Sequence, residues 1–160
     1  MKTRKEKYIM NMLNLYNKVV GLPLGKRIFS KMVCIKAPYF NTIKPLFEEL
    51  KAGKCVITMK KRRSVHNHIG TVHAIAMCNI SELAAGTMLE ASIPKDMRWI
   101  PKKMSVEYLQ VAKTDLKAVC ALQEVKWEGS FDLPITVDVT DKANNVVFRA
   151  VIAMYVSPKK

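Results

Sequence analysis

The stretch SVHNHIGTVHAIAMCNISELAAG, residues 64–86, decides how this chain folds. It holds all three histidines and leads into an apolar run in which Glu82 is the one charged residue between Thr71 and Leu89. This run predicts a helix from Thr71 to Glu90, stopped by Pro94. At 1.5 Å per residue such a helix is about 30 Å long, and a nearly uncharged helix of that length has to be covered on most sides.

The segments before this helix predict a mixture of short elements. Apolar residues spaced three and four apart over 8–20 predict an amphipathic helix, and the Gly- and Pro-containing segment 21–25 ends it. We further predict a short strand at Met32–Ile35, a short helix between Pro45 and Gly53, and a strand at Cys55–Met59.

After the helix the hydrophobic period changes to two. Strands are predicted at 104–108, 116–127, 135–139 and 146–156, with a turn at 141–145. Strands grouped after a helix are typical of an α+β fold, with a curved antiparallel sheet wrapped around a long central helix. One such sheet leaves flanks of the helix exposed, and dimerisation would cover them. We expect an N-terminal amphipathic helical extension over residues 1–29 and the main domain over residues 30–160.

Composition narrows the possible partners. The length of 160 residues suits one domain with a substantial core. The four cysteines are far apart and lie in apolar runs, which predicts reduced, buried thiols in a cytoplasmic protein. The net charge of +14 suits nucleic acid, an anionic membrane or a phosphorylated small molecule. No secretory signal is expected. A membrane span is not expected either, because His73, Asn79 and Glu82 interrupt the best candidate.

The motif itself resembles the signature of hotdog-fold thioesterases, especially the phenylacetate-degradation (PaaI-like) type. Those proteins have an Asn, then Gly-x-x-His-Gly-Gly, then an acidic residue nine positions after the His; here these are Asn67, Gly70, His73 and Glu82. The segments at 37–63 and 98–109 are also similar to a branch of this superfamily. The resemblance implies a hotdog fold and a homodimer with shared active sites, with a dimer of dimers as a further option.

The start of the helix is the predicted reaction site. Free amides and the positive end of the helix dipole would stabilise the oxyanion formed from a thioester carbonyl. Gly70 permits close approach and Thr71 is a candidate cap. The candidate donors are the amides from Thr71 to Ile75, and the resemblance points to Ala74. This chain departs from the family in having Ala74-Ile75 for Gly-Gly, and Glu for the usual Asp.

Glu82 is the candidate general base, or less readily a nucleophile. Nine residues turn a helix by about 180°, so Glu82 faces away from His73. In the dimer that the resemblance implies, it would serve the helix start of the partner subunit. Its small neighbours, which include Cys78 and Asn79, leave room for a ligand. The alternative is a carboxylate that is merely exposed to solvent or ion-paired.

The remaining candidates have weaker signals. Asn67 would orient water or the thioester, or serve only as a turn residue. His73 is expected to bond to backbone at the helix start. The histidines at 66, 68 and 73 lack metal-ligand spacing, so no metal is expected. Arg62, Arg63 and Lys95 would hold phosphates of coenzyme A, or form a solvated basic surface.

The predicted function is hydrolysis of an acyl-CoA or acyl-carrier thioester, without a cofactor other than the coenzyme A of the substrate. The alternative is a non-catalytic acyl-CoA or fatty-acyl binding protein with the same pocket. Nucleic acid is not an expected partner, because no stripe of aromatic residues lies among the basic ones and only 8% of residues are aromatic.

Overall fold

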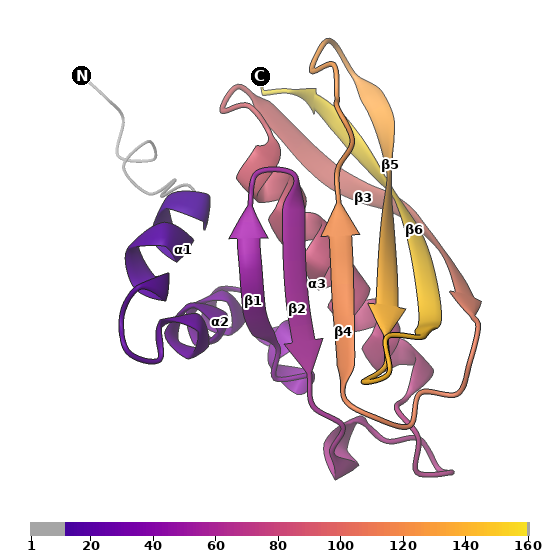
Figure 1. Cartoon of the computed structure of the whole chain (residues 1–160). Coiled ribbons are helices and arrows are strands. Elements are labelled where there is room, and N and C mark those ends of the chain that lie inside the picture. Colours follow the sequence, from indigo (N-terminus) through magenta and orange to yellow (C-terminus); the bar gives the residue numbers. More distant parts are fainter. Residues whose placement is uncertain (1–11, 160) are drawn as a thin grey trace.

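Eleven elements follow one another along residues 12–159, the part of the chain that the computed structural model describes (Figure 1). They are α1 (Met12–Val20), α2 (Gly25–Lys36), η2 (Pro38–Thr42), β1 (Leu46–Lys51), β2 (Lys54–Met59), η3 (Arg63–Val65), α3 (Ala74–Ser92), β3 (Met97–Tyr108), β4 (Leu116–Ala121), β5 (Phe131–Thr140) and β6 (Val146–Pro158).

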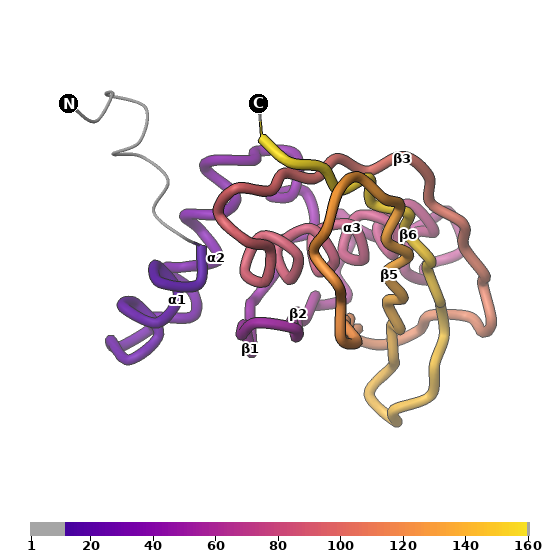
Figure 2. Tube along the Cα trace, turned by 90° about the horizontal axis from the view of Figure 1, so that it is seen from above, coloured from indigo at the N-terminus to yellow at the C-terminus, as the bar shows by residue number. Residues whose placement is uncertain are grey.

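The six strands form one antiparallel sheet in the order β1-β2-β4-β5-β6-β3. The long strands β3, β5 and β6 curl around α3, as the two perpendicular views show (Figures 1 and 2). The register places Ala150 of β6 between Val106 of β3 and Val137 of β5. β1 and β3 are the two edge strands, and α1 and α2 pack against β1. The predicted α+β architecture, a curved sheet around a long central helix, is confirmed.

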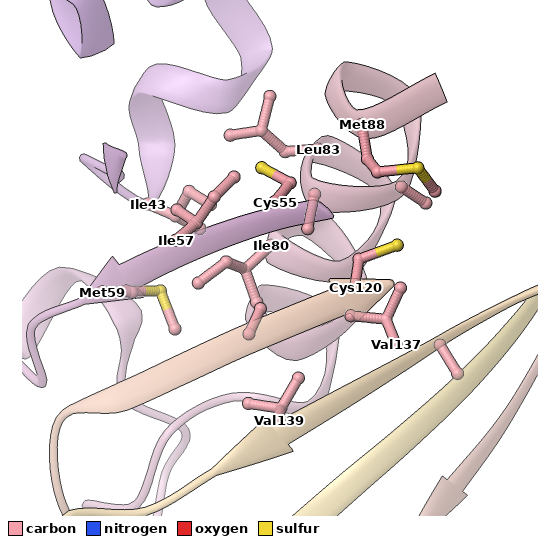
Figure 3. Close-up of a cluster of buried hydrophobic side chains, with 14 of the residues drawn as sticks. Ile43, Cys55, Ile57, Met59, Ile80, Leu83, Met88, Cys120, Val137 and Val139 are labelled. Atoms are coloured by element: carbon pink, nitrogen blue, oxygen red, sulfur yellow. The ribbon is translucent and has the colours of Figure 1, made fainter. Parts of the chain in front are cut away.

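Helix α3 is buried along most of its length, and its two charged side chains, Glu82 and Glu90, are exposed. Ile80 and Leu83 of α3 meet side chains of the sheet in the core, such as Ile57 of β2 (Figure 3). Burial of apolar side chains at about 25 cal/mol per Å² is what holds the helix in the sheet. None of the helices described between residues 12 and 159 combines the length and apolar character needed to cross a membrane.

The cysteines lie as free thiols. Cys55 and Cys120 oppose each other on β2 and β4, and both are buried. Burial raises the pKa of the Cys120 thiol to about 12 and that of Cys55 well above its usual value. Cys34 is also buried, whereas Cys78 is half-buried. The prediction of unbridged thiols is confirmed, and the prediction of burial is confirmed for all but Cys78.

The strand predicted at Met32–Ile35 is wrong, because this segment lies inside α2. A run of four apolar residues fits either element, and here Phe29 and Val33, four residues apart, point into the core on one face of a helix. The N-terminal helix is observed as α1 from Met12, and residues 8–11 lie outside the described residues. The predicted domain boundary at residue 30 falls within α2 and stays a prediction.

The helix predicted between Pro45 and Gly53 is also wrong, because β1 occupies this segment and pairs with β2. A bulge between Phe47 and Glu49 shifts the strand alternation by one residue. The buried residues Phe47 and Leu50 are therefore three apart, which imitates a helical period. Gly53 has φ of +78° and forms the tight turn between β1 and β2 rather than a helix end.

Several strand boundaries also differ from the prediction. β4 ends at Ala121, so residues 122–127 of the predicted strand lie outside the observed one, and β3 begins at Met97, before the alternation at 104–108. β5 begins at Phe131 and not at 135, and β6 continues to Pro158. Helix α3 begins at Ala74 and not at Thr71, since the Val72 amide donates to the carbonyl of Ala112 and holds this residue in the preceding loop.

Candidate active site at the start of helix α3

The loop before α3 is closed by Asn67. Its Oδ1 accepts the amides of Ile69 (3.2 Å) and Thr71 (3.0 Å), and its Nδ2 donates to Oγ1 of Thr71 at 2.7 Å. Gly70 has φ of +78°, a conformation that favours glycine, at the turn of this loop. Asn67 and Thr71 thus hold one another, which fixes the approach of the chain to the helix.

The helix is capped by His73 and not by Thr71, so the predicted Thr71 cap is wrong. The His73 Nδ1 accepts the amide of Ile75 at 3.1 Å, and the His73 carbonyl accepts the amide of Ala76 at 3.0 Å. An imidazole nitrogen here replaces the hydroxyl or carboxyl oxygen that caps most helices. The prediction that His73 bonds to backbone at the helix start is confirmed.

The Ala74 amide differs from the neighbouring amides in its hydrogen bonding. Among the five candidate donors, Thr71 donates to Asn67, Val72 to Ala112, His73 to Val65 and Ile75 to the His73 side chain. Within residues 12–159 the Ala74 amide has no hydrogen-bond partner. A free, positively polarised N–H at a helix start is the group that an oxyanion needs.

A pocket of about 190 Å³ lies beside this helix start. His73, Ile75, Ala76 and Asn79 of the α3 region line one side. Asn79 is only 6% exposed; its Nδ2 donates to Oγ1 of Thr42 at 3.0 Å, and its Oδ1 is buried without a partner. A buried, unpaired acceptor carries an energetic penalty that a bound water or ligand donor would remove.

His66 is the second group of this pocket with an unused atom. Its Nε2 is buried without a partner within the described residues. From the sequence His66 is a candidate only for a metal site, and no sequence signal marks Thr42, which comes from η2. No group of three or more His, Cys, Asp or Glu side chains within residues 12–159 is placed to hold a metal.

Glu82 lies farther along the same helix and is exposed in the single chain. Eight residues separate it from Ala74, which corresponds to about 12 Å along the axis. Glu82 lines the mouth of a second pocket, of about 390 Å³, bounded by α1, α2, η2, α3 and β3. One chain therefore holds the candidate base and the candidate oxyanion donor on one helix, but too far apart to act on one carbonyl.

Cys78 lies between these two groups on α3. Its Sγ is 3.8 Å from the phenol oxygen of Tyr108, at the end of β3. Burial raises the pKa of Tyr108, with a further contribution from the hydrogen bond to Cys78. No sequence signal marks Tyr108 as a site residue, because only the fold brings the end of β3 to this turn of α3.

The three predicted phosphate ligands lie in different settings. The Arg62 guanidinium donates to the carbonyls of Thr42 (2.6 Å) and Ile43 (2.9 Å), so it holds the end of η2. Arg63 is exposed near the helix start, whereas Lys95 is exposed beyond the C-terminal end of α3. Since α3 has 19 residues, Arg63 and Lys95 lie at ends about 28 Å apart within one chain.

Several solved structures have a fold similar to that of this chain. Genomics APC5556 is 46% identical, with a TM-score of 0.82 over 92% of this chain and 99% of that chain. PA5026 from Pseudomonas aeruginosa, named as a protein of unknown function and "Probable Thioesterase", is 20% identical, with a TM-score of 0.74 over 86% of this chain and 97% of that chain. Thioesterase HI1161 from Haemophilus influenzae is 8% identical, with a TM-score of 0.69 over 79% and 87% of the two chains.

These likenesses, with the curved sheet around α3, define the class of the protein: it has the hotdog fold expected from the resemblance to PaaI-like thioesterases. Residues 25–156 match the family model "Domain of unknown function (DUF4442)", and the chain belongs to this family. No curated protein matches the sequence.

Proposed function

We propose that this protein is an acyl-CoA thioesterase that acts as a homodimer, with each active site built from the helix start of one subunit and Glu82 of the other. The observation that carries this proposal is the free amide of Ala74 on a helix that also carries Glu82. Thioesterase names among the structural neighbours support the same reaction class.

The chemistry follows from these two groups. Glu82 takes a proton from water, and the water oxygen forms a bond to the thioester carbonyl carbon. The carbonyl electron pair moves to oxygen, and the resulting oxyanion accepts the Ala74 amide hydrogen. When the carbonyl re-forms, the carbon–sulfur bond breaks, and the thiolate of coenzyme A leaves and takes up the proton held by Glu82. No further cofactor is needed.

The distance between the two groups is the reason for the dimer. A base acts through one water on a carbon that lies about 3 Å from each reacting group, so about 12 Å within one helix is too long. A two-fold axis that pairs two α3 helices in opposite directions would bring Glu82 to the partner's helix start. The free edge of β3 supports such an axis, because two antiparallel edge strands join into one sheet.

The remaining features fit a coenzyme A substrate in a reducing compartment. Arg63 is the exposed cation nearest to the helix start in the sequence, and Lys95 of the partner would complement it in an antiparallel dimer. Asn67 holds the loop in position, and we assign its contribution to that positioning. We place the protein in the cytoplasm, where its four unbridged thiols would remain reduced.

The test is release of free thiol from a series of acyl-CoA substrates by the wild type and Glu82→Gln. We expect turnover in the wild type and a loss of about 10²- to 10⁴-fold in kcat in the variant, with binding retained. Saturable binding without turnover in the wild type would instead favour the acyl-CoA binding protein. The side chain of Ile75, 54% exposed where the family has glycine, is the observation that favours that alternative.

A mixing experiment tests the shared site. Ala74→Pro removes the candidate donor and Glu82→Gln removes the base, so neither homodimer has a complete site. In a mixed dimer one site receives both defects and the other receives none, so random mixing restores about a quarter of wild-type activity. Absence of recovery after exchange, with mixed dimers demonstrated by a tag on one variant, would contradict sharing.

A further inference from the structure

The pocket behind Glu82 continues along α3 as a groove. Glu82, Gly86 and Glu90 form a stripe on one face of the helix at spacings of four residues, and all three line the groove. The opposite wall comes from the N-terminal part of the chain, with Val33 of α2 and Phe40 of η2. α1 and η2 contact α3 directly.

The indole of Trp99 covers the helix face from Gly86 to Glu90 and leaves the part of the groove beside Glu82 open. A Cβ built on Gly86 would be 3.0 Å from Cη2 of Trp99, so the ring and the helix backbone are as close as glycine allows. The Trp99 Nε1 donates to Oε2 of Glu90 at 2.9 Å, which fixes the position of the ring. The hydrogen bond between the Trp99 Nε1 and the Glu90 carboxylate thus holds the apolar indole ring against α3, at the point where β3 passes the helix.

The lining suits a hydrocarbon chain. Its charged members, Lys36, Glu82 and Glu90, are exposed and can lie at the rim, whereas Val33, Leu83 and Gly86 are buried. The volume of about 390 Å³ lies at the lower end of the range for small-molecule pockets. A buried apolar chain gains about 0.8 kcal/mol for each methylene group, or about fourfold in affinity.

We propose that this groove binds the acyl chain of the substrate and that Trp99 sets the upper limit of its length. The proposal rests on the proposed thioesterase function, in which the thioester carbonyl lies beside Glu82. The chain then runs from Glu82 towards Gly86 in the subunit that supplies the base. The Trp99 ring meets the helix at Gly86, four residues or about 6 Å beyond Glu82, and an extended chain spans about 1.2 Å per bond, so about five carbons fit.

The test measures binding without turnover. Thioether analogues of acyl-CoA, which have no scissile carbonyl–sulfur bond, are titrated calorimetrically into the full-length wild type over chains of two to sixteen carbons. We expect affinity to rise by about fourfold for each methylene and to stop rising near five carbons. A wild-type profile that is flat, or that rises steadily to sixteen carbons, would overturn the proposal.

Variants of the groove make the test specific. Trp99→Ala should extend the rise by at least two carbons, so that the seven-carbon analogue binds about tenfold more tightly than to the wild type. The limiting chain length of Trp99→Phe should lie between those of the wild type and Trp99→Ala. Gly86→Ala should shorten this limit, because the added methyl group pushes the indole into the groove. Trp127→Ala is the matched control, because Trp127 contacts Phe131 and does not line the groove, so its loss should leave the profile unchanged.

The two proposals fail separately. A length limit that moves with Trp99, without any thioester hydrolysis, would retain the acyl groove and reject the enzyme. Hydrolysis with one length profile in the wild type, Trp99→Ala and Trp99→Phe would retain the enzyme and reject the groove. If Trp127→Ala moved the limiting chain length as far as Trp99→Ala does, the role of Trp99 would also be overturned.

Discussion

The imidazole of His73 accepts the amide of Ile75 at 3.1 Å, and the amide between them, that of Ala74, is left without a partner within residues 12–159. One side chain therefore stabilises the helix and leaves a single N–H for a substrate. The preceding amides are used by Asn67, Ala112 and Val65, which come from the loops around the helix start.

Substitution of His73 should separate stability from catalysis. His73→Ala removes the cap and should lower the free energy of unfolding by about 1 kcal/mol. His73→Asn and His73→Asp provide another capping side chain and should retain the stability of the wild type. His73→Asp also brings a negative charge to the place where the oxyanion forms, so kcat should fall with stability intact. Urea unfolding and thiol-release kinetics measure the two effects. Equal activity of the Asn and Asp variants would contradict an oxyanion at this helix start.

Ala74→Pro should remove the donor and preserve the fold. Proline is well tolerated at the first helical position, the Ala74 N–H makes no internal hydrogen bond, and His73 has the extended φ and ψ (−64°, 138°) that precede proline well. We expect kcat to fall by about 10²- to 10³-fold, with the melting temperature unchanged or raised. Ala74→Ser, which keeps the N–H, is the control. An active Ala74→Pro protein would exclude this amide from the reaction.

Arg62 and Arg63 are adjacent but should respond differently. Arg62→Ala removes the bonds to the carbonyls of Thr42 and Ile43, and should lower the free energy of unfolding by about 1–3 kcal/mol. Arg63→Ala should leave stability within about 0.5 kcal/mol and raise KM for acyl-CoA, with a steeper loss at low salt. Denaturant titration and KM at two ionic strengths separate these roles. A KM effect confined to Arg62 would reverse the assignment.

Cys78 should be the first thiol to react in the folded protein. Burial raises the pKa of Cys34, Cys55 and Cys120, and their thiols are shielded from reagent. At pH 8 a disulfide reagent should modify one thiol rapidly and the other three only after unfolding. Mass spectrometry identifies the site, and Cys78→Ser should abolish the rapid phase. Rapid labelling of Cys55 or Cys120 would contradict the packing of β2 against β4.

Asp115 should add a small acid-sensitive contribution to stability. Its Oδ1 accepts the amide of Lys61 at 2.8 Å, and this hydrogen bond, with the ion pair to Lys142, holds the pKa of the carboxyl below its usual value. A lowered folded-state pKa stabilises the protein above about pH 4, and that stability is lost as the pH falls further.

Asp115→Asn should therefore be less stable than the wild type at pH 7, by less than about 1 kcal/mol because the carboxyl is partly exposed. The difference should shrink at pH 3, as measured by urea unfolding at both values. A difference that is the same at pH 3 and pH 7 would show that the charge of Asp115 has no part in it.

The sequence by itself determined the central helix and the strands that follow it. A run with one carboxylate over nineteen residues has to be a covered helix, and the alternation at 135–139 fits a strand with one buried face. The resemblance of the motif to hotdog-fold thioesterases also pointed to Asn67, His73, Ala74 and Glu82.

Only the tertiary structure decided β1, the free amide and the end of the groove. The bulge after Phe47 hides the strand period, since pairing with β2 and not local preference fixes the backbone there. Ala74 is free because loops distant in sequence take the neighbouring amides, and Trp99 reaches Gly86 because β3 curls back over α3. Such contacts depend on which segments meet in space, and the residue pattern of one segment does not contain that information.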